Sequence, residues 1–362
     1  MNTSTAVIGF PSVYIQGPNA LQQLRGQLHQ SLNAQHALVV TDPVVAHLFE
    51  APSAAGDPDV SLEVLHFSGE CTEAEVQRLC RLAHQPAPQA VVGAGGGKAL
   101  DVAKAVSLQL NLPLMIVPTA ASSDAPTSRL IALYDEQHRI VAVPTLRRNP
   151  DVVLVDTGVI ARAPRRLLVA GIGDAITKRH EVSRALEAGV VNYCGGKGTG
   201  LSLLLAEQAY YTLRRDTAKA LEAQARGEPD AAFERVVEAA VLYSGLAFES
   251  GGLCIAHGLL RGLTARAETQ QALHGELVAY GLLIQLRAFE HDESEIEDLM
   301  HFYREIGLPT RCRDIGLPVP DASQALELAE RTMTAPYVAA WAPRLHASHI
   351  AQALLTHEER AA

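Results

Sequence analysis

The chain has 362 residues, which is enough for two domains that each bury a core of their own. Its formal net charge of −10, with no block of like charges, argues against nucleic acid as a partner, because that binding depends on basic surface. The five cysteines are scattered and form no C-x-x-C motif, which predicts reduced thiols in a cytoplasmic protein. We find no signal-peptide pattern and no run of 18 apolar residues, so we expect a soluble protein with no membrane segment.

The first half of the chain alternates between short apolar runs and amphipathic segments. Two apolar stretches within residues 6–16 predict edge strands, and a helix is expected to start near Asn19. Thr72, with Glu75 in capping-box spacing, opens a predicted helix that ends near His84. Further strands are predicted over residues 37–40, 60–67, 90–92, 113–117 and 151–155, further helices from Pro43 and from Lys98, and a hairpin-like pair over 129–134 and 139–143.

A glycine-rich loop joins the strand over 90–92 to the next helix. Gly93, Gly95, Gly96 and Gly97 precede Lys98, so backbone N–H groups at a helix N-terminus can face a phosphate group with a lysine beside them. Val92 and Ala99 occupy positions where a P-loop needs glycine and a hydroxyl residue, which excludes that motif. The pattern fits a phosphate cradle, and a simple turn is the alternative.

Two other loops follow predicted strands. Asp42 comes directly after the strand over 37–40, where it can accept hydrogen bonds from a ribose or only cap the next helix. Residues 118–128 are rich in hydroxyl groups and proline and contain one carboxylate. This composition suits a ligand-binding loop at a strand end or a solvated connection.

The second half is helical. Long helical patterns cover residues 165–188, 200–225, 231–250 and 275–290. We therefore place a boundary near residue 162, with an α/β domain over 1–162 and an all-helical domain over 163–362.

Three candidate metal ligands lie in the helical half: Asp174, His257 and His274. One carboxylate and two imidazoles suit zinc or iron and leave coordination positions open for a substrate. The spacing alone is not diagnostic, because a histidine among apolar residues is more often a packed core residue.

Several motifs in order along residues 10–310 resemble the glycerol dehydrogenases, within the group III (iron-containing) alcohol dehydrogenase superfamily. They are residues 93–104, 118–128, 149–157, 168–175, 248–253 and 274–281. The resemblance implies a Rossmann-like domain followed by a helical-bundle domain, as in dehydroquinate synthase, with the site in a cleft between them. It also implies NAD, Zn²⁺ (with Fe²⁺ as the alternative) and a homo-oligomer. On this resemblance, residues 1–162 form the NAD-binding α/β domain and residues 163–362 the helical metal- and substrate-binding domain.

The resemblance also assigns roles residue by residue. Asp174, His257 and His274 match the metal ligands, and Asp124 matches the residue that contacts a polyol hydroxyl. An acidic Asp42 favours NAD over NADP. A proton relay could run through a water chain, the cofactor ribose or His180. The matched cofactor contacts are Asp42, Gly95, Gly96, Gly97, Lys98, Thr119, Ser122, Ser128, Leu130 and Tyr134.

The sequence departs from the family pattern around the predicted site. Leu260 and Arg261 replace a histidine and an asparagine, and Lys178, Arg179 and His180 replace an apolar-aromatic stretch. Cationic residues near a pocket favour an anionic substrate, such as a hydroxy acid or a phosphorylated alcohol. We expect Lys178 and Arg179 to lie on a solvated helix face. Whether Arg261 selects an anionic substrate is left open.

Together these features predict a metal-assisted, NAD-dependent oxidoreductase of a small polyol or related secondary alcohol, such as glycerol. The alternatives are a dehydrogenase of an anionic substrate selected by Arg261, a lyase of the dehydroquinate synthase type, and a non-catalytic nucleotide-binding or sensory protein.

Overall fold

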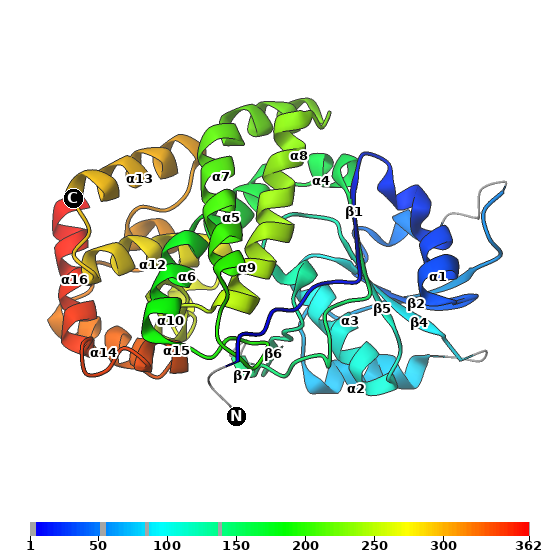
Figure 1. The fold of residues 1–362 in the computed structure, drawn as a ribbon, viewed down its shortest axis with the longest axis horizontal. Coiled ribbons are helices and arrows are strands. Elements are labelled where there is room, and N and C mark those ends of the chain that lie inside the picture. The colour runs from blue at the N-terminus through cyan, green and yellow to red at the C-terminus, as the bar shows by residue number, and fades with distance from the viewer. Residues whose placement is uncertain (1–4, 51–55, 84–86, 137–139, 362) are drawn as a thin grey trace. The chain divides into compact units, whose positions relative to one another are not determined.

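The computed structural model of the chain describes residues 5–50, 56–83, 87–136 and 140–361 (Figure 1). The chain forms two compact units. The sheet unit comprises Gly9–Arg165 and Lys219–Leu242, and the helical unit comprises the described part of Met1–Ile8 with Arg166–Ala218 and Tyr243–Ala362.

The sheet unit contains a six-stranded sheet in the order β1-β8-β5-β4-β2-β3, with every neighbouring pair parallel. The central strands β4, β5 and β8 are buried throughout, which explains why they read as short, continuous apolar runs. The strands are β1 (Val13–Gly17), β2 (His36–Thr41), β3 (Ser61–His66), β4 (Ala90–Gly95), β5 (Leu114–Pro118) and β8 (Val152–Asp156); a separate antiparallel pair is β6 (Leu133–Tyr134) and β7 (Ile140–Ala142).

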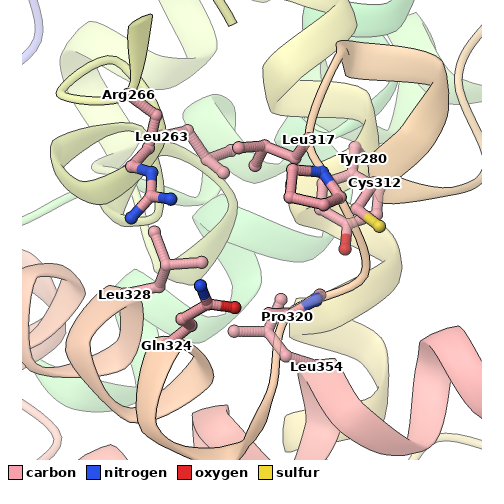
Figure 2. Close-up of a pocket in the computed structure, with 10 residues that line it drawn as sticks. Leu263, Arg266, Tyr280, Cys312, Leu317, Pro320, Gln324, Leu328 and Leu354 are labelled. Atoms are coloured by element: carbon pink, nitrogen blue, oxygen red, sulfur yellow. The ribbon is translucent and has the colours of Figure 1, made fainter. Parts of the chain in front are cut away.

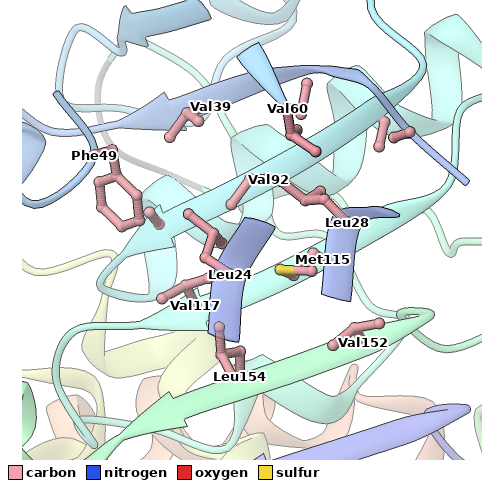
Figure 3. Close-up of a cluster of buried hydrophobic side chains, with 14 of the residues drawn as sticks. Leu24, Leu28, Val39, Phe49, Val60, Val92, Met115, Val117, Val152 and Leu154 are labelled. Atoms are coloured by element: carbon pink, nitrogen blue, oxygen red, sulfur yellow. The ribbon is translucent and has the colours of Figure 1, made fainter. Parts of the chain in front are cut away.

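One core of the sheet unit lies between the sheet and helix α1. Leu24 and Leu28 of α1 pack over Val92, Met115 and Leu154 of the sheet (Figure 3). The helices of this unit are α1 (Leu24–Leu32), α2 (Glu73–Leu82), α3 (Gly97–Leu110), α4 (Thr157–Arg162), α8 (Ala231–Glu238) and the end of α7 (Gly200–Arg226). The Thr72 cap is confirmed, since its side chain accepts a hydrogen bond from the Glu75 N–H at 3.2 Å.

The register of the sheet brings three predicted site loops to one edge. Thr41 of β2 lies opposite Ala94 of β4, and Gly95 of β4 lies opposite Pro118 of β5. The segments that follow, which start at Asp42, Gly96 and Thr119, therefore leave the sheet side by side at its carboxyl end, where α/β folds bind ligands.

The helical unit contains the rest of the long helical patterns. Its helices are α5 (Arg165–Ile176), α6 (Lys178–Ala188), the first part of α7, α9 (Ser244–Gly251), α10 (Ile255–Gly258), α11 (Leu260–Leu263), α12 (His274–Ala288), α13 (Glu293–Ile306), α14 (Ala322–Met333), α15 (Pro336–Ala339) and α16 (Ala347–Ala361). The predicted helix over 165–188 is in fact two helices that meet at Thr177. A π-helical segment, Ala239–Tyr243, joins α8 to α9 within the pattern over 231–250.

The predicted fold class, a Rossmann-like part followed by a helical part, is confirmed, with local corrections. The predicted helix after Pro43 is only a 3-10 turn, Ala46–Leu48, because the Asp42 side chain accepts hydrogen bonds from the two N–H groups after Pro43. Before Pro11, the predicted strand reduces to a single bridge between Ala6 and Lys197.

The two units are not divided at a single point near residue 162, because each unit consists of separate segments of the chain. Residues 219–242 belong to the sheet unit, where Gln224 Nε2 donates to the Ala163 carbonyl at 3.1 Å and Thr157 Oγ1 donates to Glu234 Oε1 at 2.6 Å. The cofactor and metal roles given to residues 1–162 and 163–362 stay predictions. Within the described residues no single helix is long and apolar enough to cross a membrane; one pair, 231–251 with 255–263, meets the length and composition criteria only when taken together across a 91° bend.

Candidate active site

The glycine loop between β4 and α3 has the backbone that its sequence predicts. Gly95 has φ +137°, and a Cβ there would lie 2.8 Å from the Ala99 Cβ and 3.0 Å from Asp42 Oδ2, so the position requires glycine. Gly96 is the N-cap of α3 and brings no side-chain cap. The first N–H groups of α3 are therefore suited to a phosphate ligand.

The two oxygens of the Asp42 carboxylate have different surroundings. Its Oδ1 accepts from the Val44 N–H at 2.9 Å and the Val45 N–H at 3.3 Å, which fixes the turn after β2. Its Oδ2 lies beside Gly95 in the glycine loop. The turn therefore holds the carboxylate next to the predicted phosphate cradle, where a ribose contact would need it.

Lys98 has a carboxylate partner. Its Nζ lies 2.7 Å from Glu70 Oε2 and 5.4 Å from the centroid of the Tyr134 ring, and its side chain is 48% exposed. The backbone of Tyr134 is held in place by its N–H, which donates to the Cys71 carbonyl at 2.8 Å.

Lys104 supports this edge of the sheet unit, and sequence reasoning missed it. It is fully buried and donates to Asp101 Oδ1 at 3.1 Å, the Ala125 carbonyl at 2.8 Å and the Leu130 carbonyl at 2.9 Å. It thereby ties α3 to the loop that carries the predicted contacts Thr119, Ser122, Asp124, Ser128 and Leu130. The i, i+3 spacing of Asp101 and Lys104 was the available signal.

The helical unit brings the three predicted metal ligands together. His257 Nε2 lies 3.4 Å and His274 Nε2 lies 4.0 Å from Asp174 Oδ1, and the three ligand atoms all lie within 4.8 Å of one another. Asp174 is fully buried, whereas the His274 side chain is 47% exposed. A metal in this position would have buried ligands on one side and access for a substrate on the other.

Close contact between α5 and α12 makes this approach possible. A Cβ on Gly275 would lie 1.8 Å from the Ala170 carbonyl oxygen, and one on Gly173 would lie 2.7 Å from the Gly275 carbonyl oxygen. Any side chain at these two positions would push the helices apart. Gly173 and Gly275, next to Asp174 and His274, therefore allow the two helices to approach closely enough to bring these ligands together.

Glu181 orients His257 and is a second residue that sequence reasoning missed. Its Oε2 lies 2.7 Å from His257 Nδ1, and its Oε1 accepts from the backbone N–H groups of Cys254 and His257, each at 3.0 Å. Burial disfavours the His257 cation, but the Glu181 carboxylate outweighs burial and raises the pKa of His257 to about 9. A carboxylate behind a histidine ligand is a common arrangement at metal sites, because it fixes the ring and makes it a stronger ligand.

Comparison with known proteins agrees with this geometry. Residues 11–157 match the model of the iron-containing alcohol dehydrogenase family. A glycerol dehydrogenase of Pseudomonas putida is 40% identical over 327 residues, with 88% of each chain covered. The chain belongs to the iron-containing alcohol dehydrogenase family.

Two further relatives support the family assignment. A glycolaldehyde reductase of Halobacterium salinarum is 39% identical over 88% of this chain and 87% of its own length. The structure of a probable glycerol dehydrogenase from Sinorhizobium meliloti superposes with a TM-score of 0.90 at 33% identity, covering 99% of both chains. The prediction of an oxidoreductase of the alcohol dehydrogenase type is confirmed, and the relatives support a polyol dehydrogenase.

In this enzyme Lys178 is not on a solvated helix face, so that prediction is wrong. It is fully buried, and its Nζ donates to Asp174 Oδ1 at 2.5 Å and to the Asp174 carbonyl at 2.9 Å. The two residues are four positions apart, on either side of the junction at Thr177, and both are fully buried. Arg179 is only partly exposed, with its guanidinium carbon 4.7 Å from the centroid of the Tyr210 ring.

Neither His180 nor Arg261 belongs to the group formed by Asp174, His257 and His274. His180 packs edge-on against Tyr210 and His291, with 5.7 Å between ring centroids in each case, and its ligand atoms group with His291 and Glu295. Arg261 is exposed and donates to Thr334 Oγ1 at 3.4 Å. A role of His180 in proton relay and a role of Arg261 in selecting an anionic substrate stay predictions. These contacts do not support either role.

The helical unit of the enzyme also contains a mostly apolar pocket. Arg266 and Gln324 lie on one side of it, and Tyr280 and Cys312 lie on the other (Figure 2). None of Asp174, His257 and His274 lines it. The pocket is therefore distinct from the candidate metal site.

Proposed function

We propose that the enzyme transfers hydride between NAD and a small polyol or related secondary alcohol, assisted by a divalent metal that Asp174, His257 and His274 hold. The observation that carries the proposal is the approach of these three ligands to within 4.8 Å of one another. The names of the relatives, glycerol dehydrogenase and glycolaldehyde reductase, point to a small hydroxylated compound as the substrate.

The residues fit a zinc ion, and Fe²⁺ is the alternative that the family name suggests. Two imidazoles and one carboxylate are the donors of open, catalytic zinc sites. When bound, the metal would supply Lewis acidity that lowers the pKa of an alcohol and so favours hydride loss to NAD.

The chain's own residues prepare this site. Glu181 fixes the His257 ring through Nδ1 and leaves Nε2 directed at Asp174. Lys178 holds Asp174 Oδ1 and its carbonyl, so the carboxylate keeps one orientation in the buried interior. The exposed edge of His274 leaves the ligand group open to an alcohol.

We propose that NAD binds at the carboxyl edge of the sheet. The N-terminus of α3 and Lys98 would bind the pyrophosphate. Asp42 would accept hydrogen bonds from the adenosine ribose and repel the 2′-phosphate of NADP. Roles for Thr119, Ser122, Ser128, Leu130 and Tyr134 in cofactor contact, and for Asp124 in polyol contact, come from the family pattern, as does the expectation of a homo-oligomer. The expectation of a cytoplasmic location comes from the scattered cysteines.

The test is NADH formation from a panel of glycerol, 1,2-propanediol, 2,3-butanediol, glycerol phosphates and 2-hydroxy acids. We expect turnover led by the neutral diols, loss of turnover with a chelator, and recovery with zinc. Asp174→Asn should abolish turnover, while His301→Gln, which changes a histidine with a 71% exposed side chain, should not. Turnover of anionic substrates alone would overturn the polyol assignment in favour of selection by Arg261. No turnover with metal and NAD bound would favour a lyase or a non-catalytic nucleotide-binding protein.

A further inference from the structure

A second group of metal-ligating side chains lies in the helical unit, separate from the proposed catalytic ligands. His180 on α6, His291 just before α13 and Glu295 in the first turn of α13 each place a ligand atom within 4.8 Å of the other two. His291 Nδ1 lies 2.9 Å from Glu295 Oε2, and the His180 and His291 rings meet at an angle of 75°. The two groups have no residue in common.

Helix α6 serves both groups through different faces. Lys178 and Glu181 are three residues apart and contact Asp174 and His257. His180 lies 200° around the helix from Lys178 at the usual ~100° per residue, and it packs against Tyr210 and His291 instead. A ligand on His180 would therefore occupy a site of its own.

The protonation states suit a cation at neutral pH. Burial, with the positive charge of Arg179, lowers the pKa of His180 to about 4, so its ring is neutral and can act as a ligand. Burial opposes the charge of Glu295, but its hydrogen bond with His291 outweighs burial and lowers its pKa, so it is a carboxylate. The His291 and Glu295 side chains are 23% and 36% exposed, which gives a hydrated ion access from solvent.

Two guanidinium groups, those of Arg184 and Arg179, lie near the cluster, and their positive charges would oppose a bound cation. Arg184 Nη2 lies 3.3 Å from His291 Nε2, but Arg184 also pairs with Glu187 at 2.8 Å and stacks on the Phe289 ring at 4.5 Å. These partners can hold Arg184 when it leaves His291. Arg179 stacks on Tyr210 at 4.7 Å. The cluster therefore has one competitor for the cation, Arg184, that keeps other partners if it leaves His291, and a second, Arg179, that stacks on Tyr210.

We propose that His180, His291 and Glu295 form a second divalent-cation site, selective for zinc and similar borderline metals. Two imidazoles and one carboxylate are donors that such metals prefer over Ca²⁺ or Mg²⁺, which favour oxygen. Because its ligands come from α6 and from the start of α13, the ion joins two segments more than a hundred residues apart in the chain. Its role is to hold these helices together, and it takes no part in hydride transfer.

The test is the number of zinc ions bound per chain after metal removal and equilibrium dialysis. We expect two for the unchanged protein, and one for each of His291→Gln and Glu295→Gln, with dehydrogenase activity retained in both variants. Retained activity also shows that the variants fold. Asp174→Asn should lose the other ion, so failure of the catalytic-site proposal alone would appear as one ion in the unchanged protein and none in His291→Gln.

His301 and Glu305 provide a matched control. They form the same i, i+4 pair on α13, 3.2 Å apart, but both are well exposed and no third ligand joins them among the described residues. His301→Gln should therefore keep both ions. Equal zinc content in the unchanged protein and in His291→Gln would overturn the proposal, and so would loss of an ion in His301→Gln, because a solvent-exposed pair would then bind as well.

Discussion

Glu181 lies behind His257, with its Oε2 2.7 Å from the ring Nδ1 that faces away from Asp174. The two residues are 76 positions apart in the chain, and Glu181 is fully buried. This pairing fixes the direction of one metal ligand and also sets its affinity for protons. It therefore leads to two predictions, one on metal affinity and one on pH.

Glu181→Gln should weaken metal binding about 10- to 100-fold, as removal of the partner behind a histidine ligand usually does. The amide keeps the size of the side chain but lacks the charge that strengthens the imidazole as a ligand. Zinc affinity, measured by competition with a chromophoric chelator, checks this. Glu305→Gln, on the exposed face of α13, is the control and should change nothing; an unchanged affinity in Glu181→Gln would contradict the orienting role.

Metal binding should release a proton at neutral pH. The pKa of His257 is raised to about 9, so its protonated form is the stable one in the metal-free protein until pH rises through that value, and a metal must displace this proton below it. Apparent affinity should rise about tenfold per pH unit between pH 6.5 and 8.5. Calorimetric titrations in two buffers of different ionisation enthalpy measure the proton directly. Affinity independent of pH, with no proton released, would show that His257 is already neutral.

Lys178→Met should destabilise the metal-free enzyme by about 3 kcal/mol, because it removes the cation that contacts the buried Asp174 carboxylate most closely and leaves His257 at 3.4 Å as the remaining one. Zinc should recover much of this loss, since the metal then compensates the same carboxylate. Urea unfolding with chelator and with zinc, beside the exposed Lys219→Met as control, measures both effects. Equal destabilisation in the two conditions would mean that Lys178 acts only through packing.

Glu70→Gln should tighten NAD binding roughly 2- to 5-fold, the range expected for losing one ion pair in which the lysine is about half exposed. Glu70 holds Lys98 at 2.7 Å, so a pyrophosphate at this loop has to compete with the carboxylate for the lysine. Lys98→Met should weaken NAD binding. Fluorescence titration of NADH onto both variants tests the pair, and weaker binding in Glu70→Gln would instead make Glu70 part of the cofactor site.

The sequence predicted the parts of the site that follow local rules. Short buried strands, the glycine loop before α3 and the Thr72 cap all depend on neighbours within a few residues, and the structure has each of them. The three metal ligands were identified through the family pattern, because their spacing alone did not distinguish them from packed core residues.

The remaining features depend on contacts between distant segments. Nothing local marks the break at Thr177 between α5 and α6, because apolar periodicity continues through it. Lys178 was expected to be solvent-exposed as a charged residue in a helix, but the fold buries it beside Asp174, with the Phe248 ring of α9 5.8 Å from its Nζ. Glu181 had no visible role until the fold brought His257 to it.

The most direct test of the account is NADH formation from 1,2-propanediol by the metal-stripped enzyme as zinc is returned. The account predicts no turnover without metal, full recovery with zinc, recovery also in His291→Gln, and none in Asp174→Asn or His274→Gln. Turnover by the stripped enzyme, or by Asp174→Asn with NAD bound, would contradict the claim that Asp174, His257 and His274 hold the metal on which the reaction depends.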